Sequence, residues 1–198
     1  GQASLTLQAD TFERLCLGQL HETIGPSEFE DATAHYIQVM ADKTGSLISA
    51  SARLGIVLSG APAEYEEPLR VYGEKVGVAF QLIDDVIDIS EAGPSGKTPG
   101  TDLRAGVPTL PVLLLRKAAA AGDSEAQSLI DFIDAGLEED AKLNEALVRL
   151  RNHEVAELSY LEAKRWADEA VEALEILPEG SVKNALAQFA QAVVDRTN

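Results

Sequence analysis

The sequence is poor in the residues that crosslink a chain, span a membrane or bind a polyanion. It holds one cysteine, Cys16, so no disulfide can form within it, and we expect a cytoplasmic protein. No apolar run approaches the roughly 18 residues of a membrane-spanning helix, and the N-terminus lacks a signal-peptide pattern. With 16 basic and 33 acidic residues, the formal net charge is -17. We therefore expect no nucleic-acid partner, although metal ions or a few lysines could still bind a small phosphorylated substrate.

The sequence also lacks the alternation of apolar and polar residues that marks β-strands. Apolar residues recur at helical spacing instead, and glycine, proline and other turn residues punctuate the chain. We expect helices over residues 3–20, 27–58 and 64–90, a loop to about residue 107, and about four or five further helices, the first opened by Pro108. With no internal repeat and no long linker, residues 1–198 are predicted to form one all-helical domain.

One predicted helix carries acidic residues on a segment that is otherwise apolar enough to be buried. Gln81, Asp84, Asp85 and Asp88 are spaced i, i+3, i+4 and i+7, so they share one helical face. Burying unpaired carboxylates is costly, whereas clustered carboxylates supply the oxygen ligands of Mg²⁺, which bridges to substrate phosphates. A solvated acidic face is the alternative. The apolar flanks favour a face that lines an internal cavity.

Two further segments contain lysines that could bind an anionic substrate. The loop 96–104 holds Lys97 among glycines and hydroxyl residues, a composition typical of a diphosphate-binding loop and also of a plain surface loop. Lys43 and Thr44 lie in a stretch of small residues suited to tight helix packing, so the lysine needs an anionic partner or must reach solvent. The histidines show no metal-ligand spacing, and we interpret all three as structural or surface residues: His21, His35 and His153.

Taken together, in their order along the chain, these segments resemble the polyprenyl synthetase family of trans-isoprenyl diphosphate synthases. Residues 80–88, followed by Gly96-Lys97, residues 100–104 and 109–111, look like its second aspartate-rich region. Residues 43–48 look like its Lys-Thr segment, and residues 16–19 resemble its Gly-Glu/Gln segment. The likeness covers roughly residues 10–115, and four ordered segments are far more specific than one short motif. The remaining residues fit only as the family's variable helical tail.

The resemblance implies an isoprenoid-synthase-type helical bundle around a central cavity, present as a homodimer. It implies an Mg²⁺-dependent prenyltransferase that condenses isopentenyl diphosphate with an allylic diphosphate to make linear polyprenyl diphosphates in isoprenoid biosynthesis. The metals would stabilise charge on the leaving diphosphate, and an apolar pocket would keep water from the allylic cation. The implied site residues are Asp84, Asp85 and Asp88 for the metal, with Asp84 as a direct ligand, Lys43 and Lys97 for the allylic diphosphate, and Thr44 and Gln81 beside it.

Two departures from the family pattern leave alternatives open. The first aspartate-rich motif, which in the family lies upstream of residue 10, is absent, so we expect N-terminal helices to be missing from this chain. Val107 stands where many members carry a lysine. A catalytically silent partner subunit could also lack the first motif, but it would not need buried aspartates. A terpene cyclase on the same fold is disfavoured by the Lys-Thr segment and the loop. We expect a medium or long product, such as a quinone side-chain precursor.

Overall fold

The computed structural model describes residues 1–91 and 98–197. Within these residues the chain forms helices and connecting turns and contains no strand, so the predicted all-α class is confirmed. Two compact units emerge, one of residues 1–81 and 163–196 and the other of residues 82–162. Helices α4 and α9 each run from one unit into the other. The prediction of a single domain over residues 1–198 stays a prediction. No helix of the described residues is long and apolar enough to cross a membrane.

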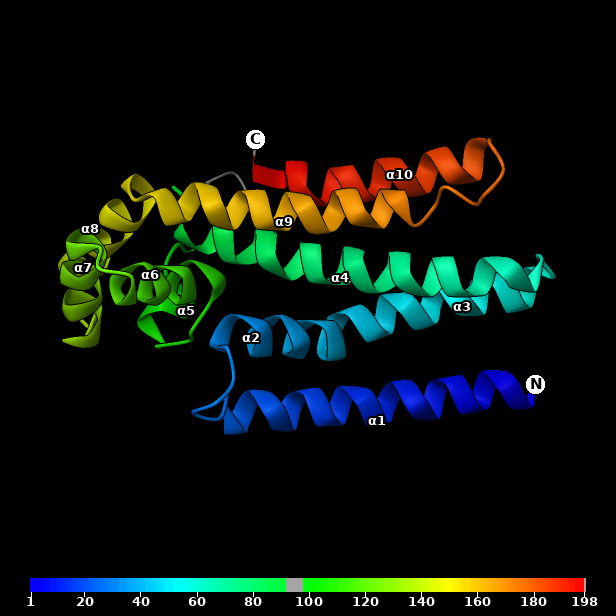
Figure 1. Cartoon of the computed structure of the whole chain (residues 1–198), viewed down its shortest axis with the longest axis horizontal. Coiled ribbons are helices and arrows are strands. Elements are labelled where there is room, and N and C mark those ends of the chain that lie inside the picture. Colours follow the sequence, from blue (N-terminus) through cyan, green and yellow to red (C-terminus); the bar gives the residue numbers. More distant parts are fainter. Residues whose placement is uncertain (92–97, 198) are drawn as a thin grey trace. The chain divides into compact units, whose positions relative to one another are not determined.

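The first unit is built from long helices that lie alongside one another (Figure 1). Helix α1 packs against a continuous rod made of α2, the π-helix η1 and α3. Its elements are α1 (Gln2–Ile24), α2 (Ala32–Met40), η1 (Ala41–Gly45), α3 (Ser46–Ser59), the 3₁₀-helix η2 (Ala63–Tyr65), the first part of α4 (Glu66–Ile89), the second part of α9 (Glu154–Glu172), and α10 (Ser181–Val194). Buried apolar side chains from several of these helices form its core, among them Val39, Leu69, Val76, Ala170 and Leu174.

Glycines allow α4 to approach the rod closely. A Cβ atom added to Gly77 would lie 2.5 Å from the Cα of Gly45, and one added to Gly73 would lie 2.6 Å from the Cα of Ser49. These distances are much shorter than a van der Waals contact, so the two backbones can lie this close together only because Gly77 and Gly73 have no side chain. The predicted packing role of the small residues is therefore confirmed for the buried Gly45, Ser46, Ser49 and Ala50, whereas Ser51 and Gly55 further along are exposed.

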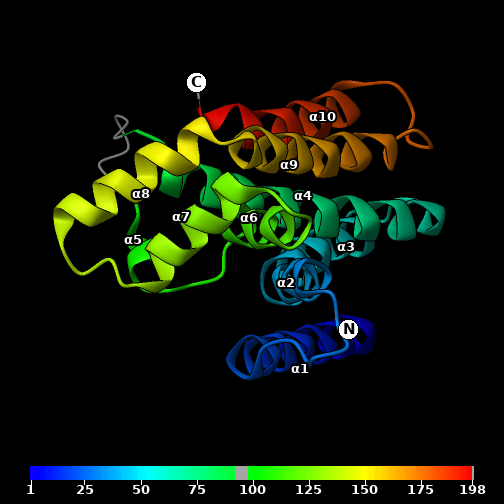
Figure 2. The ribbon, with the colours of Figure 1, turned by 60° about the vertical axis from the view of Figure 1, so that its left-hand side comes forward.

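The second unit contains shorter helices, in which α6 packs against α7 and α7 against α8 (Figure 2). Its elements are the last part of α4, then α5 (Thr101–Arg104), α6 (Leu110–Ala120), α7 (Ser124–Asp134), α8 (Asp140–Asn152) and the first part of α9. Leucines from the larger helices form its core, among them Leu115, Leu129, Leu147 and Leu150. The second 3₁₀-helix, η3 (Asp195–Thr197), ends the described chain.

Three details of the predicted helices were wrong. At the helix starts concerned, carboxylates accept the first N–H groups, one of them from a neighbouring residue and two from residues further away in the chain. Helix α2 starts after Asp31, whose carboxylate accepts the Ala34 N–H at 2.8 Å, rather than at residue 27. Helix α6 starts after Thr109, so Pro108 lies outside it. The expected loop to residue 107 contains the short helix α5. The prediction of about four or five helices after the loop is confirmed by α6 to α10.

Candidate active site

The predicted Lys-Thr segment lies on a π-helical turn. Residues Ala41–Gly45 form η1, which carries Lys43 and Thr44 and joins α2 to α3 without a break. Such turns are rare and occur frequently at functional sites, because the extra residue changes the direction in which neighbouring side chains project. This feature could not be predicted from the sequence, since a π-turn has no residue pattern of its own.

Thr44 contacts a second predicted site residue directly. Gln81 on α4 donates a hydrogen bond from its amide nitrogen Nε2 to the hydroxyl oxygen of Thr44 at 2.8 Å, and both residues are half-buried. Since the hydroxyl oxygen accepts this bond, its own proton can be donated to a further acceptor. The structure therefore brings together two of the residues that the resemblance assigns to the diphosphate site.

Lys43 points its ammonium group at a carboxylate of α1. Its Nζ lies 2.5 Å from Oε2 of Glu22, and the same oxygen accepts a hydrogen bond from Gln19 at 2.8 Å. The Lys43 side chain is about a quarter exposed. Of the two predicted alternatives, an anionic partner or a side chain that reaches solvent, the structure shows the first for this partly exposed lysine. The partner, Glu22, was not predicted from the sequence.

A partly buried ionic cluster fixes the backbone next to Lys43. Arg14 on α1 donates to Asp42 and to Glu74 on α4, each at 2.6 Å, and Gln38 also donates to Asp42 at 3.0 Å. Burial disfavours the charged guanidinium, but the hydrogen bonds to Glu74 and Asp42 outweigh this effect and raise the pKa of Arg14. The cluster ties α1, η1 and α4 together. An aspartate and a lysine side by side in a stretch of small residues were the signal that could have revealed it.

Asp85 is a helix-capping residue as well as a predicted metal residue. It is buried, with 6% of its surface exposed, and its Oδ2 accepts the N–H of Leu110, the first residue of α6, at 3.0 Å. The first N–H groups of a helix have no partner within it and carry a partial positive charge, so a carboxylate there is favourable. Asp85 thereby anchors the start of α6.

Asp88 does the same for the short helix α5. Its two carboxylate oxygens accept the N–H groups of Thr101 at 3.1 Å and Asp102 at 3.3 Å, and its backbone carbonyl accepts the Gly100 N–H at 2.7 Å. Burial, followed by the nearby charge of Asp102, raises the pKa of Asp88 against the opposing effect of these hydrogen bonds. Asp84, one turn earlier on α4, is half-buried.

The sequence of this chain matches a known protein family over most of its length. Residues 2–150 match the family model described as polyprenyl synthetase. The chain belongs to this family. It is 39% identical over 197 residues to nonaprenyl diphosphate synthase of Mycobacterium tuberculosis, covering 99% of this chain and 58% of that protein. It is 34% identical to octaprenyl diphosphate synthase of Haemophilus influenzae, also over 58% of its length.

Solved structures of family members have the same fold. The crystal structure of geranylgeranyl pyrophosphate synthase from Corynebacterium glutamicum, complexed with calcium and isoprenyl diphosphate, matches with a TM-score of 0.89 and 37% identity, over 99% of this chain and 60% of that one. The isoprenoid-synthase-type fold is therefore confirmed. The chain spans less than two thirds of the length of these relatives.

The carboxylates on α4 fit the metal that the family resemblance implies by their chemistry. Asp84, Asp85 and Asp88 offer oxygen ligands, which Mg²⁺ prefers over nitrogen or sulfur. Among the described residues, no three histidine, cysteine or acidic side chains are already arranged to hold a metal ion. Lys97 lies outside the described residues. Val107, where many family members carry lysine, is exposed after α5.

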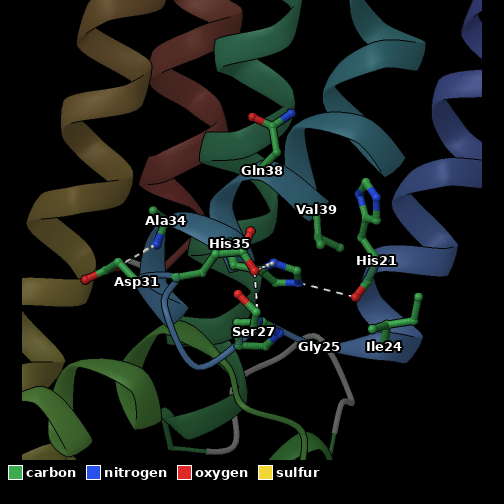
Figure 3. Close-up of a pocket in the computed structure, with 11 residues that line it drawn as sticks. His21, Ile24, Gly25, Ser27, Asp31, Ala34, His35, Gln38 and Val39 are labelled. Atoms are coloured by element: carbon green, nitrogen blue, oxygen red, sulfur yellow. Dashed lines mark hydrogen bonds and ion pairs between the residues drawn. The ribbon is translucent and has the colours of Figure 1, made fainter.

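A cavity of about 500 Å³ lies at the turn between α1 and α2. Figure 3 shows His35 beside the end of α1, where its Nε2 lies 3.2 Å from the carbonyl oxygen of His21 and its Nδ1 lies 3.9 Å from Glu30. The two histidine rings are 6.4 Å apart and tilted. His153 is buried in the other unit, where it accepts the Val155 N–H at the start of α9. These contacts agree with the structural and surface roles predicted for the histidines.

Arg151 fixes the end of the helix that carries the aspartates. Its guanidinium donates to the carbonyl oxygens of Ile89 at 2.6 Å and Ser90 at 3.2 Å. The last carbonyls of a helix carry a partial negative charge, which a cation stabilises. Arg151 also lines a cavity of about 480 Å³ together with His153 and Tyr160. With Asp85 and Asp88, it anchors the last turns of α4 within the second unit.

Proposed function

We propose that the protein carrying this chain is an Mg²⁺-dependent trans-prenyltransferase, which condenses isopentenyl diphosphate with an allylic diphosphate to form linear polyprenyl diphosphates. The observation that carries the proposal is the bond between Thr44, on the π-helix with Lys43, and Gln81, which precedes Asp84 by one turn of α4. Two relatives are named nonaprenyl and octaprenyl diphosphate synthase, and a solved relative was crystallised with calcium and isoprenyl diphosphate. These names favour a linear product.

Each site residue has a distinct task in this proposal. Asp84 is a direct metal ligand, and Asp85 and Asp88 complete the acidic face while they hold α6 and α5 in place. Bound Mg²⁺ would neutralise charge on the leaving diphosphate. Lys43 and Lys97 bind diphosphate oxygens as point charges. Thr44 donates its hydroxyl proton to the diphosphate, and Gln81 orients that hydroxyl through the hydrogen bond to its oxygen.

The chemistry then follows from stabilising one leaving group and excluding water. The C–O bond of the allylic diphosphate breaks, which leaves an allylic cation and a diphosphate held by the two lysines and Thr44. The double bond of isopentenyl diphosphate attacks the cation, a carbon–carbon bond forms, and a proton is lost from the product cation. Apolar surroundings protect the cation from water.

We also infer a homodimer in the cytoplasm, as the family resemblance implies. Apolar side chains stand exposed along α1, which supports a surface covered by a second subunit: Leu5, Phe12, Leu20 and Ile24. The single cysteine supports a reducing compartment. The exchange of these apolar residues for serine should shift the assembly toward the monomer in sedimentation velocity.

The decisive experiment is a product assay on the full-length protein. With labelled isopentenyl diphosphate, farnesyl diphosphate and Mg²⁺, it should form linear products that disappear when a chelator is added. Asp84→Ala should lower the rate by about 100-fold or more, because the metal that stabilises the leaving group loses a ligand. Asp10→Ala, at an exposed position on α1, is the control and should leave the rate unchanged.

The same assay separates the alternatives. Cyclic hydrocarbon products would replace the proposal with a terpene cyclase. If the protein binds pyrophosphate but forms no product, and activity appears only when a second polypeptide is added, the protein is a catalytically silent partner subunit. An unchanged rate in Asp84→Ala would contradict the catalytic role of α4.

A further inference from the structure

The contact between Lys43 and Glu22 is built into the packing of α1 against η1. Gly18 is buried on α1, and a Cβ atom there would lie 2.7 Å from the Cβ of Asp42 and 3.1 Å from the Cγ of Lys43. The missing side chain therefore makes room for the lysine stem to cross α1. Glu22 lies one turn further on the same face of that helix, where the ammonium group meets its carboxylate at 2.5 Å.

Glu22 is itself held in place by Gln19. The Nε2 atom of Gln19 donates to the same oxygen, Oε2, that receives the lysine. Two donors on one carboxylate oxygen fix its position, much as two donors would fix an oxygen of a phosphate group. Lys43 is therefore paired with an anion that belongs to the protein, at the residue that the proposed function assigns to the substrate diphosphate.

The ion pair between Lys43 and Glu22 is placed so that a diphosphate can replace Glu22 as the partner of the lysine. The side chains of Lys43 and Glu22 are 27% and 40% exposed, and ion pairs that are this exposed to water contribute little to stability. A diphosphate with its metal ions offers a stronger partner for the ammonium group. Binding of the diphosphate would release Glu22, and departure of pyrophosphate would allow it to return.

We propose that Glu22 is an internal competitor of the diphosphate for Lys43 and thereby weakens the binding of substrate and of the pyrophosphate product. This inference rests on the proposed function and extends it to a residue that positions Lys43 without joining the reaction. It assigns a role to the turn of α1 from Gly18 to Glu22: a gap for the lysine stem, a donor that holds the carboxylate, and the carboxylate itself.

The test measures pyrophosphate affinity in the presence of Mg²⁺ by calorimetry, on the full-length protein. Glu22→Gln should bind pyrophosphate about two- to fivefold more tightly. This is the change in affinity expected when the free energy of one exposed ion pair no longer opposes binding. The KM for farnesyl diphosphate should fall by a similar factor without a rise in kcat, because substrate and transition state gain equally. Damage to the fold would weaken binding rather than strengthen it.

Two matched variants complete the experiment. Glu13→Gln removes the same charge from the opposite side of α1, since nine residues correspond to two and a half turns, and should leave the affinity unchanged. In a Lys43→Met background, Glu22→Gln should no longer increase the affinity. A gain that persists there would show that Glu22 acts as a plain surface charge, and would overturn the inference.

The remaining outcomes separate the inference from the function beneath it. If Lys43→Met weakens pyrophosphate binding but Glu22→Gln does not strengthen it, the internal competitor is excluded and the proposed function stands. If the unsubstituted protein fails to bind pyrophosphate, or if Lys43→Met binds pyrophosphate as tightly as the unsubstituted protein does, the proposed diphosphate site is wrong. The inference about Glu22 is then wrong as well.

Discussion

At the scale of single residues, the acidic face of α4 divides into carboxylates with different environments. Asp85 and Asp88 both accept N–H groups from the starts of later helices, Asp85 from Leu110 and Asp88 from Thr101. A role in the fold therefore accompanies any role in metal binding, and a loss of activity on substitution of either residue would have two possible origins. Stability measurements can separate the two.

We predict that Asp85→Ala lowers the free energy of unfolding by about 1–3 kcal/mol, because it leaves the buried Leu110 N–H without an acceptor. Asp84→Ala, at a half-buried position, should lower it by less. Asp85→Asn keeps an acceptor oxygen and should retain most of the stability while it removes the charge. Urea denaturation followed by circular dichroism measures all three. Equal stability of Asp85→Ala and the unsubstituted protein would refute the capping role.

At the scale of elements, the contact between α4 and the rod of α2, η1 and α3 is made backbone to backbone. Gly77 meets Gly45 there, and Gly45 closes the π-turn that carries Lys43 and Thr44. Because neither side of this contact has a flexible side chain that could move aside, added volume must displace a helix. The orientation of the Lys-Thr segment therefore depends on glycines that make no contact with substrate in the proposed mechanism.

Two glycine substitutions should change the stability of the protein in opposite directions. Gly77→Ala places a Cβ atom 2.5 Å from the Cα of Gly45, and should destabilise the protein by about 1–3 kcal/mol through overpacking. Gly55→Ala, on the exposed face of α3 with no atom within 4 Å of the added Cβ, should stabilise it by about 0.5–1 kcal/mol, since alanine favours a helix. Thermal unfolding of the two variants side by side provides the measurement. A stabilising Gly77→Ala would contradict the close approach.

The elements that the sequence predicted well are those decided by local patterns. Helical spacing and turn residues gave the order of the helices, and the spacing of Gln81 to Asp88 correctly placed these residues on one helix. The features it missed depend on partners distant in the chain. Asp42 is paired with Arg14, 28 residues earlier, and Asp85 with a backbone group 25 residues later. No spacing rule within one helix reveals such contacts, and the π-turn likewise forms in the packed structure.

At the scale of the whole molecule, residues far apart in the sequence secure the first unit, and one such contact is sensitive to alkaline pH. Tyr72 on α4 is buried, and its hydroxyl donates to the carbonyl oxygen of Leu186 on α10 at 2.8 Å, across 114 residues. Burial raises the pKa of Tyr72 to about 12 from an ordinary value of 10.0. The folded state therefore favours the neutral phenol, which can donate this bond, over the phenolate, which cannot.

The sign of the pH effect follows from where each state ionises. Below pH 10 the phenol is neutral in both states and its contribution to stability is complete. Between pH 10 and 12 the unfolded chain loses the proton first, so stability should fall by about 2–3 kcal/mol, at about 1.4 kcal/mol for each pH step. Tyr72→Phe should be less stable at pH 8, because it lacks the hydrogen bond, and should lose less stability up to pH 12. Urea denaturation at several pH values compares them, and parallel losses in both proteins would assign the alkaline transition to other groups.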